Sequence, residues 1–201
     1  MPQLPLFAAD TGVLADDDWG RIVYRPRFVP QATASAWFRE LRESARWEAK
    51  RRVMYDREVD VPRLTAHYGL PPEPDAPAAI ASAAERVAGA TGVAFNAVGL
   101  NLYRDGRDSV APHNDHLYEI VEGFPIVLLS LGATRRMTIR SKEPKARVIH
   151  VDLEGGSLLE MSYETQLHYT HGVPKTREPV GERISLAFRV RPVERSGSAY
   201  R

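Results

Sequence analysis

Apolar residues recur at intervals of three and four between Ala32 and Trp47, which is the period of an amphipathic helix with one buried face. The residues on that face are Ala34, Trp37, Phe38, Leu41 and Ala45. A second helix is predicted from Pro77 to Val87, because PAAIASAAERV is rich in alanine, begins at proline and is soon followed by Gly89. The stretch between the two helices, AKRRVMYDREVDVPRLTAHYGLPPEPD, contains four prolines and predicts a long loop or a short hairpin.

From Ala94 onward the pattern changes to short apolar runs bounded by glycine, proline or asparagine. The runs are VGLNLYR, FPIVLLSLG, RRMTIRS, ARVIHVDL, GSLLEMSY and ERISLAFRVRPV. Many short strands at this spacing predict a sandwich or a barrel, and FPIVLLSLG is apolar enough for a strand that is covered on both faces. Helices followed by strands indicate an α+β fold, with the helices packed on one face of the β region.

Composition makes this a single-domain globular chain. With 201 residues, 43% of them hydrophobic, it can bury a full core without disulfides, and the absence of cysteine excludes thiolate metal sites and a cysteine nucleophile. No apolar run reaches the roughly 20 residues that cross a bilayer. The N-terminal segment turns acidic at Asp16, Asp17 and Asp18, unlike a secretory signal. We therefore expect a soluble, cytoplasmic protein without a membrane partner.

The net charge of +1 is low for a protein that binds phosphates, but the cations are unevenly distributed. Residues 135–147, RRMTIRSKEPKAR, contain six arginines and lysines and only one acid. This segment predicts either a basic patch or a solvated hairpin, and the sequence leaves both alternatives open.

The triplet HND places the imidazole of His113 and the carboxylate of Asp115 two positions apart. On extended backbone, residues i and i+2 point the same way, so these side chains can converge on one ion. The triplet alone is weak evidence, because H-x-D is common by chance. Downstream, LHYTHGVPK offers His168 and His171, and two histidines with one carboxylate make the facial triad of non-haem iron(II) oxygenases.

Two arginines, Arg183 and Arg189, lie six residues apart on the predicted strand ERISLAFRVRPV and therefore share one face with Ser185 and Ala187. The opposite, apolar face is made by Ile184, Leu186 and Phe188. Arginine pairs bidentately with a carboxylate and keeps its charge, which suits the far end of a dicarboxylate co-substrate. The alternative is a solvated strand face without an anion site.

Four segments together resemble the AlkB family of Fe(II)- and 2-oxoglutarate-dependent dioxygenases in order and in spacing, and the likeness is to a bacterial member. They are NLYRDGRDSVAPHND, FPIVLLSLGATRRMTIR, GSLLEMSYETQLHYTHGVPK and RISLAFR. The resemblance covers about residues 95–191, with a weaker echo in VPRLTAHYG. It implies one dioxygenase domain over residues 1–201, with a double-stranded β-helix (jelly-roll) core at 94–193. N-terminal helices and a nucleotide-recognition lid would occupy residues 1–93.

The resemblance also implies the roles of the candidate residues. It selects His171 over His168 as the third ligand, so that Fe(II) would be bound by His113, Asp115 and His171. Arg183 would pair with the remote carboxylate of 2-oxoglutarate, and Arg189 would lie near the end that chelates iron. The full set implied to hold 2-oxoglutarate is Asn101, Tyr103, Arg183 and Arg189.

The implied reaction is oxidative demethylation of N-alkylated bases, in which 2-oxoglutarate and O₂ yield formaldehyde, succinate and CO₂ and the DNA is repaired. The substrate would be alkylated single- or double-stranded DNA, with RNA as a further candidate, and we expect a monomer. Substrate contacts are predicted for the loop from Lys50 to Tyr68, which mixes cations with aromatic rings, and for the residue after the iron-binding aspartate, where many relatives have an acid. These residues are Arg52, Tyr55, Arg63, His67, Tyr68 and His116.

Two rival functions follow from the residues that depart from this pattern. LPPEPDAPAA replaces the aromatic residues that usually follow PRLTAHYG in the family, and the net charge is close to neutral. A 2-oxoglutarate-dependent hydroxylase or demethylase of a protein or small molecule is therefore the second hypothesis. The third is a non-catalytic β-barrel binding module that keeps the fold.

Overall fold

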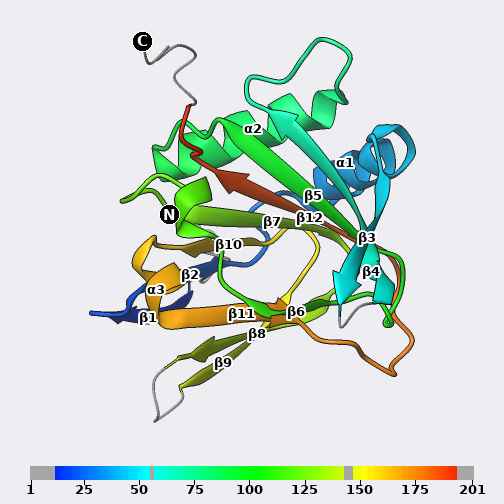
Figure 1. Cartoon of the computed structure of the whole chain (residues 1–201). Coiled ribbons are helices and arrows are strands. Elements are labelled where there is room, and N and C mark those ends of the chain that lie inside the picture. Colours follow the sequence, from blue (N-terminus) through cyan, green and yellow to red (C-terminus); the bar gives the residue numbers. More distant parts are fainter. Residues whose placement is uncertain (1–11, 55–56, 143–146, 194–201) are drawn as a thin grey trace, which may run out of the picture.

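The computed structural model describes residues 12–54, 57–142 and 147–193, which form two antiparallel sheets and two main helices (Figure 1). The larger sheet has eight strands in the order β1-β2-β10-β7-β12-β5-β4-β3. Their bounds are β1 Gly12–Asp17, β2 Gly20–Arg25, β3 Glu48–Met54, β4 Arg57–Gly69, β5 Ala97–Tyr103, β7 Ile126–Gly132, β10 Leu158–Met161 and β12 Arg183–Arg189. Segments from the beginning, the middle and the end of the described chain therefore lie side by side in one sheet.

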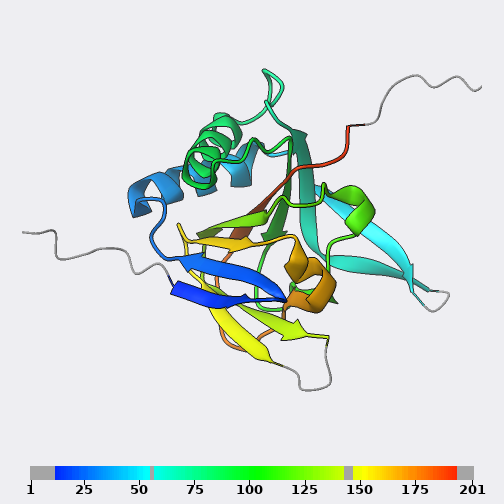
Figure 2. The ribbon, with the colours of Figure 1, turned by 90° about the vertical axis from the view of Figure 1, so that its left-hand side faces the viewer.

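The smaller sheet has four strands in the order β6-β11-β8-β9 and lies on the side of the larger sheet that faces away from the helices (Figure 2). Its strands are β6 Val110–His113, β8 Arg135–Ser141, β9 Val148–Leu153 and β11 Tyr169–Val173. Buried side chains from both sheets meet between them, among them Ile126, Leu128, Ile139 and Val151. This arrangement leaves one end of the space between the sheets for polar side chains.

Two long helices, α1 (Gln31–Ser44) and α2 (Ala78–Thr91), cover the outer face of the larger sheet (Figure 1). Leu41 of α1 and Ile80 of α2 belong to one buried cluster with Leu100 of β5. Both predicted helices, and their packing on one face of the β region, are confirmed. No helix in the described part of the chain has the length and apolar character that crossing a bilayer requires.

Alternate side chains of strand β12 point to opposite faces of the larger sheet. Ile184, Leu186 and Phe188 pack into the cluster beneath the helices, whereas Ala187 belongs to the cluster between the sheets. Every residue from Ile126 to Leu131 of the neighbouring strand β7 is buried, as the prediction of a strand covered on both faces requires. The face of β12 that carries both arginines therefore looks toward the smaller sheet.

The stretch predicted as a long loop or a short hairpin holds two strands, β3 and β4, in the part that the structure describes. β3 and β4 form a hairpin that extends the larger sheet, and β4 also pairs with β5 from Leu64 to Gly69. The register of β3 and β4 shifts between Ala49 and Arg51, which places Pro62 opposite the irregularity. Proline lacks an N–H and cannot donate a hydrogen bond between strands. At an irregularity in the pairing this loss is tolerated, which is how Pro62 lies within β4.

The N-terminal part contributes more to the sheet than the sequence indicated. Strands β1 and β2 pair with each other, and β2 pairs with β10 from the other half of the chain. A short helix, α3 (Glu164–His168), and a 3₁₀ turn, Leu117–Glu119, were also not predicted. A boundary near residue 93 therefore does not separate helices and lid from a complete β core, because β1 to β4 all belong to the larger sheet.

Candidate metal centre and co-substrate pocket

Two histidines face each other across a strand pair of the smaller sheet. In the antiparallel pairing of β6 with β11, His113 lies directly opposite His171, and their ring centroids are 4.5 Å apart. The strands approach closely beside this pair, since a Cβ atom on Gly172 would come within 2.8 Å of the Val110 carbonyl oxygen. Glycine is the residue that permits this approach. Strand pairing and the close approach at Gly172 thus bring the two imidazoles together.

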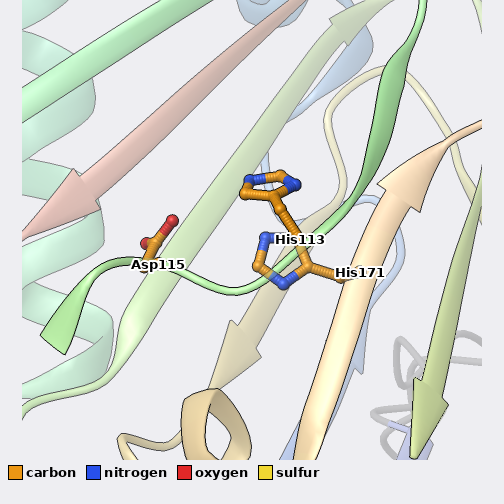
Figure 3. Close-up of side chains that lie close together, drawn as sticks. All are labelled: His113, Asp115 and His171. Atoms are coloured by element: carbon orange, nitrogen blue, oxygen red, sulfur yellow. The ribbon is translucent and has the colours of Figure 1, made fainter. Parts of the chain in front are cut away.

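Asp115 completes the group from the segment that follows β6. One ligand atom each from His113, Asp115 and His171 lies within 4.8 Å of the others, and Figure 3 shows the two rings side by side with the carboxylate next to them. The backbone N–H of Asp115 donates to Oε1 of Gln166, a buried residue of α3, at 3.0 Å. Gln166 therefore fixes the chain at the point where the carboxylate enters the site.

The carboxylate of Asp115 also pairs with Arg189 of the larger sheet. Nε of Arg189 donates to Oδ2 at 2.7 Å and Nη2 donates to Oδ1 at 3.0 Å. Such bidentate pairs are among the stronger protein hydrogen bonds. A carboxylate has about four lone-pair positions, so it can accept both N–H groups and still ligate a metal. The ion pair joins the two sheets at the metal-binding group.

Electrostatics favour the protonation states of Asp115 and His171 that metal binding needs. Burial favours the neutral form of Asp115, but the charge and hydrogen bonds of Arg189 outweigh it, so the pKa of Asp115 lies below its ordinary value. Burial, together with the nearby His113, lowers the pKa of His171 to about 4. Nδ1 of His113 lies 3.0 Å from the Ala111 carbonyl, to which an Nδ1–H would donate, leaving Nε2 as the ligand atom.

A donor set of two imidazoles and one carboxylate fits a divalent transition metal. These are the ligands of the facial triad, which leaves coordination positions open for small molecules. Among the described residues, this is the one group of three histidines or acids close enough to share an ion. The chemistry of the donor set thus agrees with the predicted Fe(II) site.

The residues predicted to hold 2-oxoglutarate lie together on β5 and β12. Arg183 pairs with Tyr103 in the strand register, and Asn101 lies opposite Ser185 on the same face. Arg183 is fully buried, and its Nη2 donates to Oγ of Ser130 at 2.8 Å. Its Nε and Nη1 have no hydrogen-bond partner among the described residues. A buried cation with free donors is costly unless an anion satisfies it, so this position fits a carboxylate.

Arg63 approaches this face from β4. Its Nε donates to Oδ1 of Asn101 at 2.7 Å, and its Nη1 lies 3.4 Å from the Ser109 carbonyl. With its oxygen facing Arg63, Asn101 directs its amide N–H₂ group elsewhere. The structure thus places Arg63, predicted as a substrate contact, against a predicted co-substrate residue.

His67, predicted as a substrate contact, lines a cavity of about 250 Å³ next to the metal-binding group. The cavity is also lined by Gly99, Arg189 and Arg191, so Arg189 is shared between the cavity and Asp115. A Cβ atom on Gly99 would lie 3.4 Å from Nδ1 of His67, so glycine leaves room beside the ring. Burial lowers the pKa of His67, and the charge of Lys50 lowers it further, so the ring is neutral at pH 7.

The other predicted substrate contacts are distributed differently. Tyr68 points to the opposite face of β4 from His67, into the cluster beneath the helices, where its hydroxyl accepts the N–H of Arg46. Tyr68 is also among the residues that line the cavity beside His67, so its role as a substrate contact stays a prediction. Arg52 lies on β3, and Tyr55 lies outside the described residues. His116 is exposed and stacks on Tyr118, with ring centroids 5.2 Å apart.

The described residues of the basic segment, 135–142 and 147, do not form a uniform cationic patch. Arg136 pairs with Asp152 and Arg147 pairs with Asp17, both at the surface. Arg135 is buried, with 3% of its surface exposed. Sequence reasoning missed the roles of Arg135 and Gln166. Arg135 differs from its neighbour Arg136 only in the alternating burial of β8, and Gln166 lies on the short helix α3, which was not predicted.

Comparison with known families and proteins agrees with this geometry. The family described as the 2OG-Fe(II) oxygenase superfamily matches residues 63–189. Mouse DNA oxidative demethylase ALKBH2 is 32% identical over 182 residues, which cover 79% of this chain and 75% of that protein. The chain belongs to the AlkB family of 2OG-Fe(II) oxygenases. The predicted family and its cofactors, Fe(II), 2-oxoglutarate and O₂, are thereby confirmed.

Further AlkB relatives extend the comparison. Human ALKBH2 is 33% identical over 148 residues, and human alkB homolog 3, named as an alpha-ketoglutarate-dependent dioxygenase, is 31% identical over 190 residues. The chain spans 56% of the length of human ALKBH2 and 65% of that of human alkB homolog 3. The solved structure of OsALKBH1 shares the fold, with a TM-score of 0.59 at 15% identity over 84% of this chain and 96% of that one. The predicted α+β class with a double-stranded β-helix core is confirmed.

Replacing Asp115 tests the metal centre of this AlkB-family chain. Asp115→Ala removes one of three ligands. Loss of a group that only supports a ligand lowers metal affinity by roughly 10- to 100-fold, so we expect loss of a ligand to lower Fe(II) affinity by more than roughly 100-fold. The measurement is bound iron per chain after anaerobic equilibrium dialysis. The matched control is Asp152→Ala, which removes an exposed, paired carboxylate and should keep the wild-type iron content. Equal iron in Asp115→Ala and the wild type would show that the metal lies elsewhere.

Proposed function

We propose that this protein removes N-alkyl groups from nucleobases of DNA by oxidation, with Fe(II), 2-oxoglutarate and O₂, and thereby repairs alkylation damage. The observation that carries the proposal is a complete ligand triad together with a buried arginine, Arg183, two of whose nitrogen atoms have no hydrogen-bond partner among the described residues. The relatives support the choice of substrate, because two of them are named DNA oxidative demethylases. A cytoplasmic location, a monomeric state and a single domain over residues 1–201 stay predictions from the sequence.

In this proposal, His113, Asp115 and His171 hold Fe(II), and the bound metal supplies activation of O₂ coupled to decarboxylation of 2-oxoglutarate. Arg183 satisfies its free donors with the remote carboxylate of 2-oxoglutarate. Arg63 orients Asn101 so that the amide N–H₂ can donate to the co-substrate. His171 stays neutral well below pH 7, so its ring is available as a ligand over the physiological range.

The cavity lined by His67, Arg189 and Arg191 is the proposed site of the target base. It adjoins the metal-binding group through Arg189, and His67 offers a neutral ring for stacking. A base inside a duplex does not reach such a cavity until it is flipped out, whereas a base in a single strand is already accessible. Lys50, whose Nζ lies 3.4 Å from Nε2 of His67, adds a cation at the edge for a phosphate.

A second candidate keeps the cofactors and changes the substrate to a protein or small molecule. The observation that favours it is that many exposed arginines already pair with acids, among them Arg46, Arg136 and Arg147. Salt dependence separates the two candidates, because phosphate contacts release counterions and weaken steeply as salt increases. The third hypothesis, a non-catalytic binding module, has less support, since every predicted metal and co-substrate position carries a residue of the expected type.

A substrate panel tests the proposed reaction. The purified protein is incubated with Fe(II), 2-oxoglutarate and methylated single-stranded DNA, duplex DNA or RNA, and base mass, formaldehyde and succinate are measured at several salt concentrations. We expect one formaldehyde and one repaired base for each coupled succinate, with omission of 2-oxoglutarate as the control. Succinate formation without a change in the mass of any methylated base would contradict the nucleic-acid substrate and favour the second candidate.

His67→Ala tests the cavity as the base site. Loss of one stacking ring should raise the KM for the DNA substrate roughly ten-fold, because stacking contributes about 1–3 kcal/mol per base. Binding of Fe(II) and 2-oxoglutarate should be unchanged. The matched control is His150→Ala, which removes an exposed ring from β9 in the other sheet. If both variants have the same KM, the base binds somewhere other than this cavity.

A further inference from the structure

A second buried guanidinium lies beside the proposed co-substrate pocket. The Cζ atoms of Arg135 and Arg183 are 5.6 and 5.1 Å from the centroid of the Tyr103 ring. Both arginines are buried. Burial lowers the pKa of Arg183, and the charge of Arg135 lowers it further, so the two arginines together favour an anion more strongly than one would.

Arg135 differs from Arg183 in the partners of its donors. Nη1 donates to the carbonyl of Asp105 at 2.9 Å, and Nη2 donates to the carbonyls of Asp108 at 2.9 Å and Pro174 at 2.8 Å. Carbonyl groups hold the guanidinium in place without neutralising its charge. Arg135 is therefore a fixed buried cation, whereas Arg183 keeps two donors free for a ligand.

The three carbonyls belong to the two segments that connect the site residues. Asp105 and Asp108 lie between Tyr103 and β6, which ends at His113, and Pro174 follows β11 directly. The segments also contact each other, because the N–H of Thr176 donates to the carbonyl of Gly106 at 2.8 Å. One side chain therefore joins the segment that leads into β6 to the segment that follows β11, and it contacts the ring of a co-substrate residue.

We propose that Arg135 is a positioning residue for the co-substrate, which favours a 2-oxo acid with a second carboxylate through its buried charge and its contact with Tyr103. Arg183 pairs with the remote carboxylate itself, and Arg135 acts through its contact with the Tyr103 ring. The inference rests on the proposed function, because it takes Tyr103 and Arg183 as residues that hold 2-oxoglutarate. It does not depend on which alkylated molecule is oxidised.

The test compares 2-oxoglutarate with 2-oxopentanoate, an acid of the same chain length that lacks the remote carboxylate. Binding to the full chain loaded with Fe(II) is measured by calorimetry under argon, so that no turnover is required. In Arg135→Met we expect the Kd for 2-oxoglutarate to rise about ten-fold, and that for 2-oxopentanoate less than about two-fold. Arg135→Gln should behave in the same way, and it keeps an amide donor for the carbonyls where Met does not. Arg135→Lys keeps the charge and should restore most of the affinity for 2-oxoglutarate.

Two further variants separate this inference from the site on which it rests. Arg136→Met, at the adjacent exposed position, should leave both dissociation constants unchanged. Arg183→Met should abolish the preference for 2-oxoglutarate over 2-oxopentanoate. Unchanged binding in the Arg135 variants, equal weakening of both acids, or no rescue by lysine would overturn the role of Arg135 and leave the proposed function intact. Unchanged 2-oxoglutarate binding in Arg183→Met would contradict the proposed function itself.

Discussion

The ion pair between Asp115 and Arg189 is the interaction on which the candidate site depends. His113 and His171 are brought together by strand pairing within the smaller sheet, but Asp115 follows the end of β6 and has no ladder partner of its own. The side chain of Arg189, on β12 of the larger sheet, pairs with the Asp115 carboxylate, and the side chain of Gln166, on α3, accepts a hydrogen bond from the Asp115 backbone. The position of the third ligand is thus set by both sheets and by a short helix between them.

Strand β12 shows how one strand serves both stability and chemistry. Ile184, Leu186 and Phe188 belong to the core beneath the helices, and the alternate residues place Arg183 and Arg189 on the site face. Arg183 keeps free donors in a buried position, which disfavours the fold locally unless an anion binds. Functional sites commonly contain buried polar groups that lack partners, and the apolar packing of the opposite face of β12 offsets the lost stability.

Helical periodicity and alanine content predicted the helices, a continuous apolar run predicted the buried strand β7, and alternation predicted the two faces of β12. Each of these patterns is local. Resemblance to the AlkB family was needed to choose His171, since the spacing from His113 gives no information about strand register. His67 and Tyr68 could not be told apart from the sequence, because the pairing of β4 with β5 decides which of two neighbouring residues faces the site. Arg135 was counted with surface cations, and its burial depends on carbonyls from Asp105, Asp108 and Pro174, far apart in sequence.

The most direct test of the account is the position of a bound metal and co-substrate in a crystal. Crystals of the full chain are grown without oxygen in the presence of Mn(II), which replaces Fe(II), and 2-oxoglutarate, and anomalous scattering locates the metal. The account predicts one anomalous peak among His113, Asp115 and His171, with the remote carboxylate of 2-oxoglutarate against Arg183. A metal peak elsewhere, or a co-substrate whose carboxylate does not contact Arg183, would contradict it.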